Sequence, residues 1–177
     1  MTLKEKTYAT FWCISLVAMF VVFAIMASDP KYNVAAMLQL EFAHNDAHFF
    51  DIMSEYDFTA DWLEMMIYLD FAFLVTFTAL FYFSLKVLMA AGKVRRRSFL
   101  GLFCLVPGAL DVIENILMIQ IIQHGGLQDK FQYFSNVVWM KWIIVVPFII
   151  LTIIAARHLF LRLFKKQPQK KTDNDLL

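Results

Sequence analysis

Three polar residues lie close together inside a long apolar stretch of this 177-residue chain and are its strongest candidates for chemistry. Asp111, Glu114 and Asn115 fall within the segment 99–123, which is otherwise almost wholly apolar. On a helix, spacings of three and four residues place all three side chains on one face. Ionisable groups in such a segment are costly unless they are paired or used, so they indicate a candidate functional site.

Two further charged residues, Asp70 and Lys141, lie inside other apolar stretches. Counted along a helix from the nearer polar end, Asp70 and Glu114 lie on the order of 12–13 Å deep, and Lys141 about 8–10 Å. Because these depths are similar and are measured from the same side, we predict one shared polar cluster. Its members are Asp70, Asp111, Glu114, Asn115 and Lys141.

Membrane-spanning helices are the elements that must position this cluster. The chain is 60% hydrophobic with a mean hydropathy of +0.61, whereas soluble domains are about 45–50% apolar. Four apolar runs, at about 8–27, 62–91, 99–123 and 137–164, reach the length that a bilayer requires. The first run exceeds the about 7–15 apolar residues of a signal peptide, which favours a retained helix. We predict an all-α, four-helix transmembrane bundle in a single membrane domain, residues 1–164.

The segment 33–58, between the first two spans, is acidic and predicts an amphipathic helical cap on the outer surface. Asn33 can cap its first helix, and apolar residues near Phe49 form a second stripe. The polar segment 165–177 predicts a disordered cytoplasmic tail. Lysine and arginine gather on the side that would carry both termini, so the positive-inside rule places the N- and C-termini in the cytoplasm.

A second constellation lies in the predicted cap. Glu41, His44, His48 and Asp51 are spaced by three, four and three residues, which places them on one face of a continuous helix. The spacing of the two histidines suits a metal site, with His44, His48 and Asp51 as candidate ligands. A solvated polar face explains the same pattern, and Asn45 can break the helix.

The polar residues also carry a resemblance to a known family. The motifs are Leu-Glu-Phe-Ala at 40–43, Leu-Asp-Phe at 69–71 and Ala-Leu-Asp-x-x-Glu-Asn at 109–115, followed by Lys141. Over about residues 8–160 the chain resembles a widespread family of small bacterial four-span membrane proteins. The resemblance implies the bacterial inner membrane and adds Glu41 to the cluster. It implies no reaction, and His44 and His48 fall outside its pattern.

Three functions remain open from the sequence. In the first, the cluster is a site that binds or conducts a proton, a cation or a small polar ligand. Alternatively, the chain is a membrane enzyme acting on lipid headgroups, or a structural subunit in which the cluster only locks helix packing. No phosphate-binding loop or nucleophile elbow is present, so no catalytic residue is predicted. The expected partners are the lipid bilayer and further copies of the chain, with no nucleic acid and no cofactor besides the candidate metal.

Overall fold

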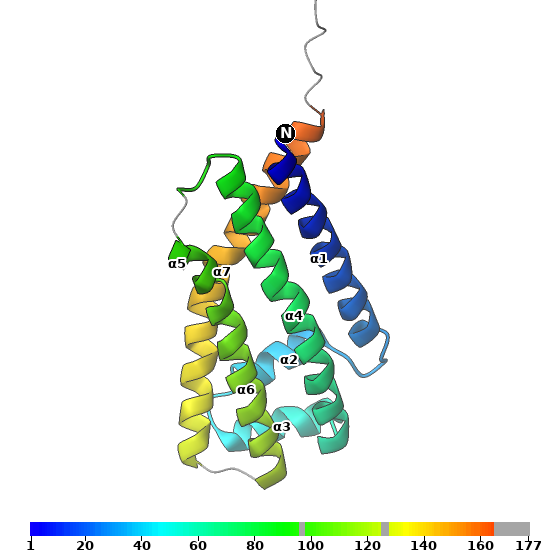
Figure 1. The fold of residues 1–177 in the computed structure, drawn as a ribbon. Helices are drawn as coiled ribbons and strands as arrows, with labels where there is room; N and C mark the ends of the chain where they lie inside the picture. The colour runs from blue at the N-terminus through cyan, green and yellow to red at the C-terminus, as the bar shows by residue number, and fades with distance from the viewer. Residues whose placement is uncertain (96–97, 125–127, 165–177) are drawn as a thin grey trace, which may run out of the picture.

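A computed structural model describes residues 1–95, 98–124 and 128–164, which are helical apart from short connections (Figure 1). The tail predicted at 165–177 lies outside the described residues. The described helices, in chain order, are α1 (Leu3–Ala27), α2 (Val34–Glu41), α3 (Asp46–Glu55), α4 (Ala60–Ala90), α5 (Ser98–Phe103), α6 (Leu105–His124) and α7 (Gln128–Phe164).

Four helical segments are long and apolar enough to cross a membrane: α1, α4, the pair α5–α6, and α7. The predicted all-α, four-helix transmembrane bundle is therefore confirmed. Two spans, α1 and α7, start at least five residues earlier than their apolar runs indicate. α1 begins at Leu3 because Thr2 and Glu5 form a reciprocal capping box. α7 begins at Gln128, and its first turns bury Phe131 and Phe134 against the segment between α1 and α4.

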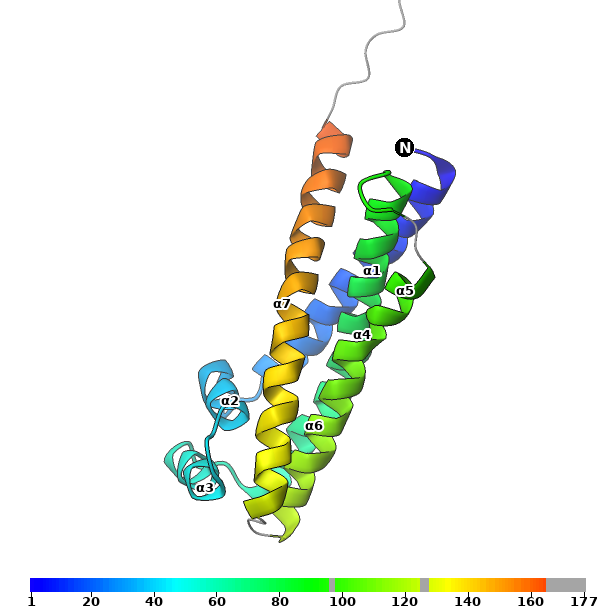
Figure 2. The same ribbon diagram turned by 90° about the vertical axis from the view of Figure 1, so that its left-hand side faces the viewer.

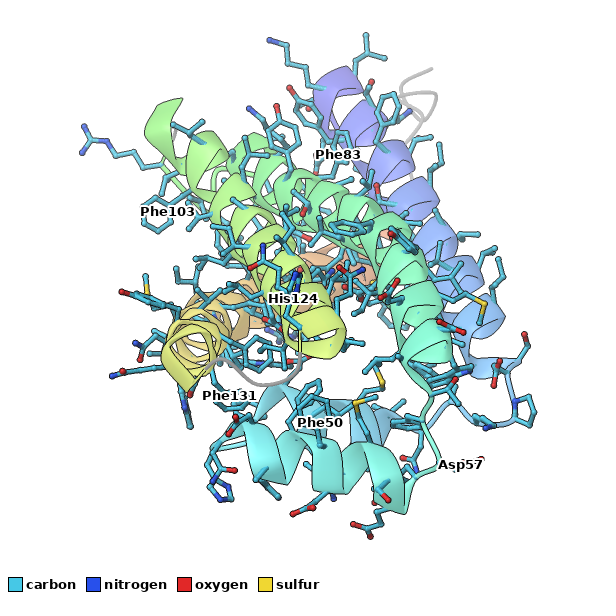
Figure 3. The ribbon with its side chains drawn as sticks, turned by 90° about the horizontal axis from the view of Figure 1, so that it is seen from below. Phe50, Asp57, Phe83, Phe103, His124 and Phe131 are labelled. Atoms are coloured by element: carbon cyan, nitrogen blue, oxygen red, sulfur yellow. The ribbon has the colours of Figure 1, made fainter. Side chains whose placement is uncertain are left out.

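That segment, residues 33–58, forms two short helices. The Asn33 side chain accepts hydrogen bonds from two backbone N–H groups at the start of α2. The Asn45 side chain accepts one from the His48 N–H and starts α3. Both helices lie against one side of the bundle near one end, crosswise to the long helices (Figures 1, 2 and 3). We call this pair the side helices.

Aromatic packing joins the side helices to α7. Phe49 of α3 and Phe134 of α7 are fully buried, with ring centroids 6.4 Å apart and nearly perpendicular planes. The Phe131 ring lies at the same distance from Phe49. Edge-to-face pairs of this kind add to the free energy gained from burial alone. The side helices are thus a packed part of the fold.

The third span is interrupted near its start. The helix breaks at Cys104, three residues before Pro107, and this break separates α5 from α6. Proline has no N–H to donate to the carbonyl of Phe103, and its ring crowds that carbonyl, so the break follows from the proline that predicted a kink. Pro147, by contrast, lies within the continuous helix α7.

Helix α4 is the centre of the bundle, since α1, α6 and α7 all pack against it. Near one end, α1 and α7 share a buried cluster that includes Trp12 and Leu159. Toward the other end the two helices diverge (Figure 1). Helix α2 lies at the end where α1 and α7 are apart, which gives its side chains access to the interior of the bundle.

Helices α4 and α6 run antiparallel and meet at three levels. Gln123 donates a hydrogen bond to Glu64 at 3.0 Å, and Asn115 donates one to Asp70 at 2.8 Å. About two turns further along, Gly108 lies directly against Thr78. A small residue at this level lets the two helices approach closely, as is common in membrane bundles.

We expect Gly108→Ala to lower the stability of the bundle by about 1–3 kcal/mol, the usual range for overpacking. A Cβ at Gly108 would lie 2.7 Å from Thr78 Oγ1, and a β-branched side chain in a helix has few other rotamers. Gly101→Ala is the matched control, because its Cβ would meet only a ring carbon of Tyr82 at 3.6 Å. Thermal unfolding in detergent compares the two; equal midpoints would contradict the close approach of α4 and α6.

Candidate functional site

A single buried lysine gathers three carboxylates from two helices. Lys141 on α7 is 6% exposed, and its Nζ lies 2.9 Å from Asp111 Oδ1 and 2.6 Å from Glu114 Oε2, both on α6. The same Nζ lies 3.1 Å from Glu41 Oε2, at the end of α2. An ammonium group has three N–H donors and no acceptor, so it can serve three carboxylates at once. The predicted residues on α6 and α7 therefore meet, and Glu41 joins them from outside the four spans.

Asp70 lies in the same region but is not paired with the lysine. Its Oδ2 accepts a hydrogen bond from Asn115 Nδ2 at 2.8 Å, and Asn115 is 4% exposed. Within residues 1–95, 98–124 and 128–164, Asp70 makes no ion pair. An amide donor satisfies a carboxylate oxygen without cancelling its charge. Asp70 is thus the cluster carboxylate without a directly opposed cation in this part of the chain.

Two residues of the site were not predicted from the sequence. Trp142 donates its indole N–H to Glu41 Oε2 at 2.9 Å, so one carboxylate oxygen accepts from both Trp142 and Lys141. The only signal for Trp142 was its place beside Lys141, because its position near a run end also suits an interfacial tryptophan. Tyr32, in the connection before α2, had no signal at all.

A cavity of about 210 Å³ lies beside the cluster, between α1, α2, α4, α6 and α7. Its polar lining comprises Glu41, Asp70, Asp111 and Lys141, together with Tyr32. The remaining lining is apolar, partly aliphatic and partly aromatic, and includes Phe23, Met26, Met37, Phe73, Phe77 and Trp142. Glu114 pairs with Lys141 but is not among the residues that line the cavity. The cavity therefore has a mainly apolar lining that also contains three carboxylates and one ammonium.

No protein-family model, curated protein or solved structure matches this chain. Membership of the bacterial four-span family therefore stays a prediction. The charges, contacts and shape of the site are the observations that indicate its chemistry.

Tyr32 lines the cavity together with the carboxylates of Asp70 and Glu41. Burial raises the pKa of Tyr32, and the nearby carboxylates of Asp70 and Glu41 raise it further. Both carboxylates disfavour a second negative charge at the phenol.

The charges of the site do not balance. Four carboxyl groups (Glu41, Asp70, Asp111 and Glu114) surround one ammonium, so full ionisation would leave a net charge of −3. Glu114 is 1% exposed, and its Oε2 receives no well-aligned hydrogen bond from the described residues, although Lys141 lies close by. Excess charge at low dielectric costs several kcal/mol per ion, so the site favours protons or a bound cation.

The side helices do not form the continuous helix that was predicted to place Glu41, His44, His48 and Asp51 on one face. The helix ends at Glu41 and restarts after Asn45, so Glu41 turns toward Lys141 while His44 stays in the connection. The His44 and His48 rings lie with centroids 4.2 Å apart, but Asp51 is exposed on α3. Across the described ranges, no three His, Cys, Asp or Glu side chains are placed to hold a metal ion. The candidate ligands His44, His48 and Asp51 are therefore not brought together.

A second set of buried polar contacts lies near the opposite end and was also not predicted. Trp12 donates its indole N–H to Ser84 Oγ at 2.8 Å, and the Ser84 hydroxyl lies 3.1 Å from Thr152 Oγ1. His158 Nε2 lies 3.0 Å from the Glu5 carboxylate, which joins α7 to α1. These contacts hold the ends of the helices together.

Proposed function

We propose that this protein is an integral membrane protein that binds a cation, the proton included, in the cavity beside Asp70. The observation that carries the proposal is the excess of carboxylates over the one ammonium, together with the cavity that three of these carboxylates line. Asp70 is the proposed principal ligand, because its oxygen is bound by an amide rather than a cation.

The proposed orientation places the end with Lys4, Lys86, Lys93 and Arg157 in the cytoplasm of a bacterial inner membrane. The acidic connections and the side helices then lie on the outer side. The carboxylate cavity would accordingly be reached from the outer half of the bilayer. The cluster consists of the residues that carry the resemblance to the bacterial four-span family, which supports the proposal that the chain belongs to it.

A purely structural role for the cluster has one supporting observation. Lys141 ties α7 to α6 and to α2, and such interhelical polar contacts hold membrane bundles together. This role accounts for Glu41, Asp111 and Glu114, and the hydrogen bond from Asn115 gives Asp70 an interhelical contact as well. It does not explain why Asp70 lines the cavity without a directly opposed cation. A variant at Asp70 therefore separates binding from packing.

The test is thermal unfolding of the purified protein between about pH 5 and pH 9, for the wild type and Asp70→Asn. Carboxyl groups that hold protons in the folded state but release them on unfolding make stability fall as pH rises. We expect the wild type to show this fall and an added cation to offset it. Asp70→Asn should show a flatter pH profile, because asparagine removes one surplus charge and keeps an oxygen acceptor for Asn115.

Asp61→Asn is the matched control, because Asp61 is an exposed residue in the first turn of the same helix. Its pH profile and cation response should follow those of the wild type. If Asp70→Asn also unfolds with the wild-type pH profile and cation response, the cluster is structural and the proposed function is wrong.

A further inference from the structure

We infer that the occupant of the cavity is a small amphiphilic organic cation, whose ammonium lies against Asp70 and whose apolar part lies among the aromatic walls. The inference rests on the proposed function and specifies its ligand class. It is carried by three features of the cavity: its mixed lining, the lack of a metal-ligand set among the described residues, and its small volume with exposed apolar residues in the wall.

The lining divides the cavity into a charged part and an apolar part. The charged part includes the carboxylates of Glu41, Asp70 and Asp111, and the apolar part includes Phe23, Phe73 and Phe77. A cation next to an aromatic ring is attracted by the ring quadrupole, and Lys141 Nζ already lies 5.6 Å from the centre of the Trp142 ring. A hydrated inorganic ion would leave the apolar walls without a favourable contact. An ammonium attached to a hydrocarbon group satisfies both parts.

The carboxylates are not arranged as ligands of a metal ion. Ca²⁺ takes about 6–8 oxygen ligands, and Mg²⁺ needs a near-octahedral shell. In the part of the chain that the structure describes, no three acidic, histidine or cysteine side chains are placed to hold a metal ion. The reason is that Lys141 occupies the point on which Glu41, Asp111 and Glu114 converge. Asp70 is left to offer a single carboxylate, which suits a monovalent ammonium.

The size of the cavity limits the occupant to a small molecule. Its volume of about 210 Å³ is below the range of about 300–1,000 Å³ for sites that enclose drug-sized ligands. Residues of its wall also face outward, since Phe23, Val34 and Leu38 are 38%, 46% and 37% exposed. In the proposed orientation these exposed apolar residues on α1 and α2 would face lipid. An amphiphile dissolved in the bilayer would then reach the cavity without crossing water.

The experiment uses the full chain in lipid nanodiscs with three probes at matched concentrations. Benzylammonium carries both the charge and the ring, ammonium carries the charge alone, and benzyl alcohol carries the ring alone. We expect only benzylammonium to raise the unfolding temperature saturably and to change the fluorescence of Trp142, which lines the cavity. Trp142→Phe identifies the Trp142 part of the signal among the four tryptophans.

Two variants test the two parts of the cavity separately. Asp70→Asn should weaken benzylammonium binding about tenfold or more, the loss expected for one charge-assisted contact. Phe73→Ala should weaken benzylammonium binding while keeping the pH profile of the wild type. Asp61→Asn again serves as the control and should bind as the wild type does. Phe73→Ala keeps the inference testable if Asp70→Asn fails to fold.

The outcomes distinguish this inference from the proposed function. Equal effects of benzyl alcohol and benzylammonium, or unchanged benzylammonium binding in both Asp70→Asn and Phe73→Ala, would overturn the inference. If protons or inorganic cations stabilise the wild type through Asp70 while benzylammonium has no effect, the proposed function stands and the organic ligand is excluded. If no probe and no pH change acts through Asp70, both fail.

Discussion

Lys141→Met is expected to destabilise the folded bundle by about 3–5 kcal/mol, the range for removing one partner of a buried ion pair. Methionine keeps an unbranched side chain but removes the ammonium that Glu41, Asp111 and Glu114 share. The carboxylates are then left uncompensated at low dielectric. The destabilisation should be larger near pH 9 than near pH 5, because protonation neutralises the orphaned carboxylates. Thermal unfolding in detergent at the two pH values measures both effects.

Lys31→Met is the matched control, because Lys31 also loses an ion pair, with Asp57 at 2.8 Å, but on the surface. Exposed pairs contribute little, so its unfolding midpoint should stay close to that of the wild type. Adding Glu114→Gln to Lys141→Met should recover part of the lost stability by removing one orphaned charge. A Lys141→Met protein as stable as the wild type at both pH values would contradict the central place of the ammonium.

Phe49→Ala is the second substitution with a large expected effect, about 3–5 kcal/mol, as for other fully buried phenylalanines. The ring fills the contact between α3 and α7, where it meets Phe131 and Phe134. Its loss should release the side helices from the bundle before the spans themselves separate. Hydrogen exchange should therefore become faster in residues 46–55 of the variant, and the unfolding midpoint should fall.

Phe50→Ala provides the comparison at the next position, because Phe50 is 36% exposed and lies at the edge of the same contact. Its effect should be well below that of Phe49→Ala, since surface substitutions are usually within about 0.5 kcal/mol. Similar exchange rates in the two variants would show that α3 does not rely on the buried ring.

The bundle was predictable because a bilayer imposes a length and an apolar composition on every span. The common face of Asp111, Glu114 and Asn115 was predictable because it follows from the helical period alone. Counting residues also indicated that Asp70 and Lys141 lie at similar depth. Depth, however, does not give the rotation of a helix about its axis. That rotation decides that Lys141 meets Asp111 and Glu114, whereas Asp70 meets Asn115.

The arrangement of the side helices was predicted least well from helical spacing and capping patterns. The spacing of Glu41, His44, His48 and Asp51 fits one helix, and it indicates a common face only if that helix is continuous. Asn45 is a strong N-cap that starts a new helix, so Glu41 and His44 do not lie on the same helix as His48 and Asp51. Glu41 then reaches Lys141 only because α2 lies where α1 and α7 diverge. This is a property of tertiary packing that no window of sequence contains.

The ion pair between Glu41 and Lys141 joins residues that are 100 positions apart in the chain. During synthesis, α1, α2, α3 and α4 emerge first, as the N-terminal part of any chain does. Glu41 then has neither the ammonium of Lys141 nor the indole of Trp142 to bind. The contacts of the side helices with α7 can therefore form only after the last span has been made. We expect the carboxylate cavity to be completed late in assembly, and a chain truncated before α7 to lack a finished site.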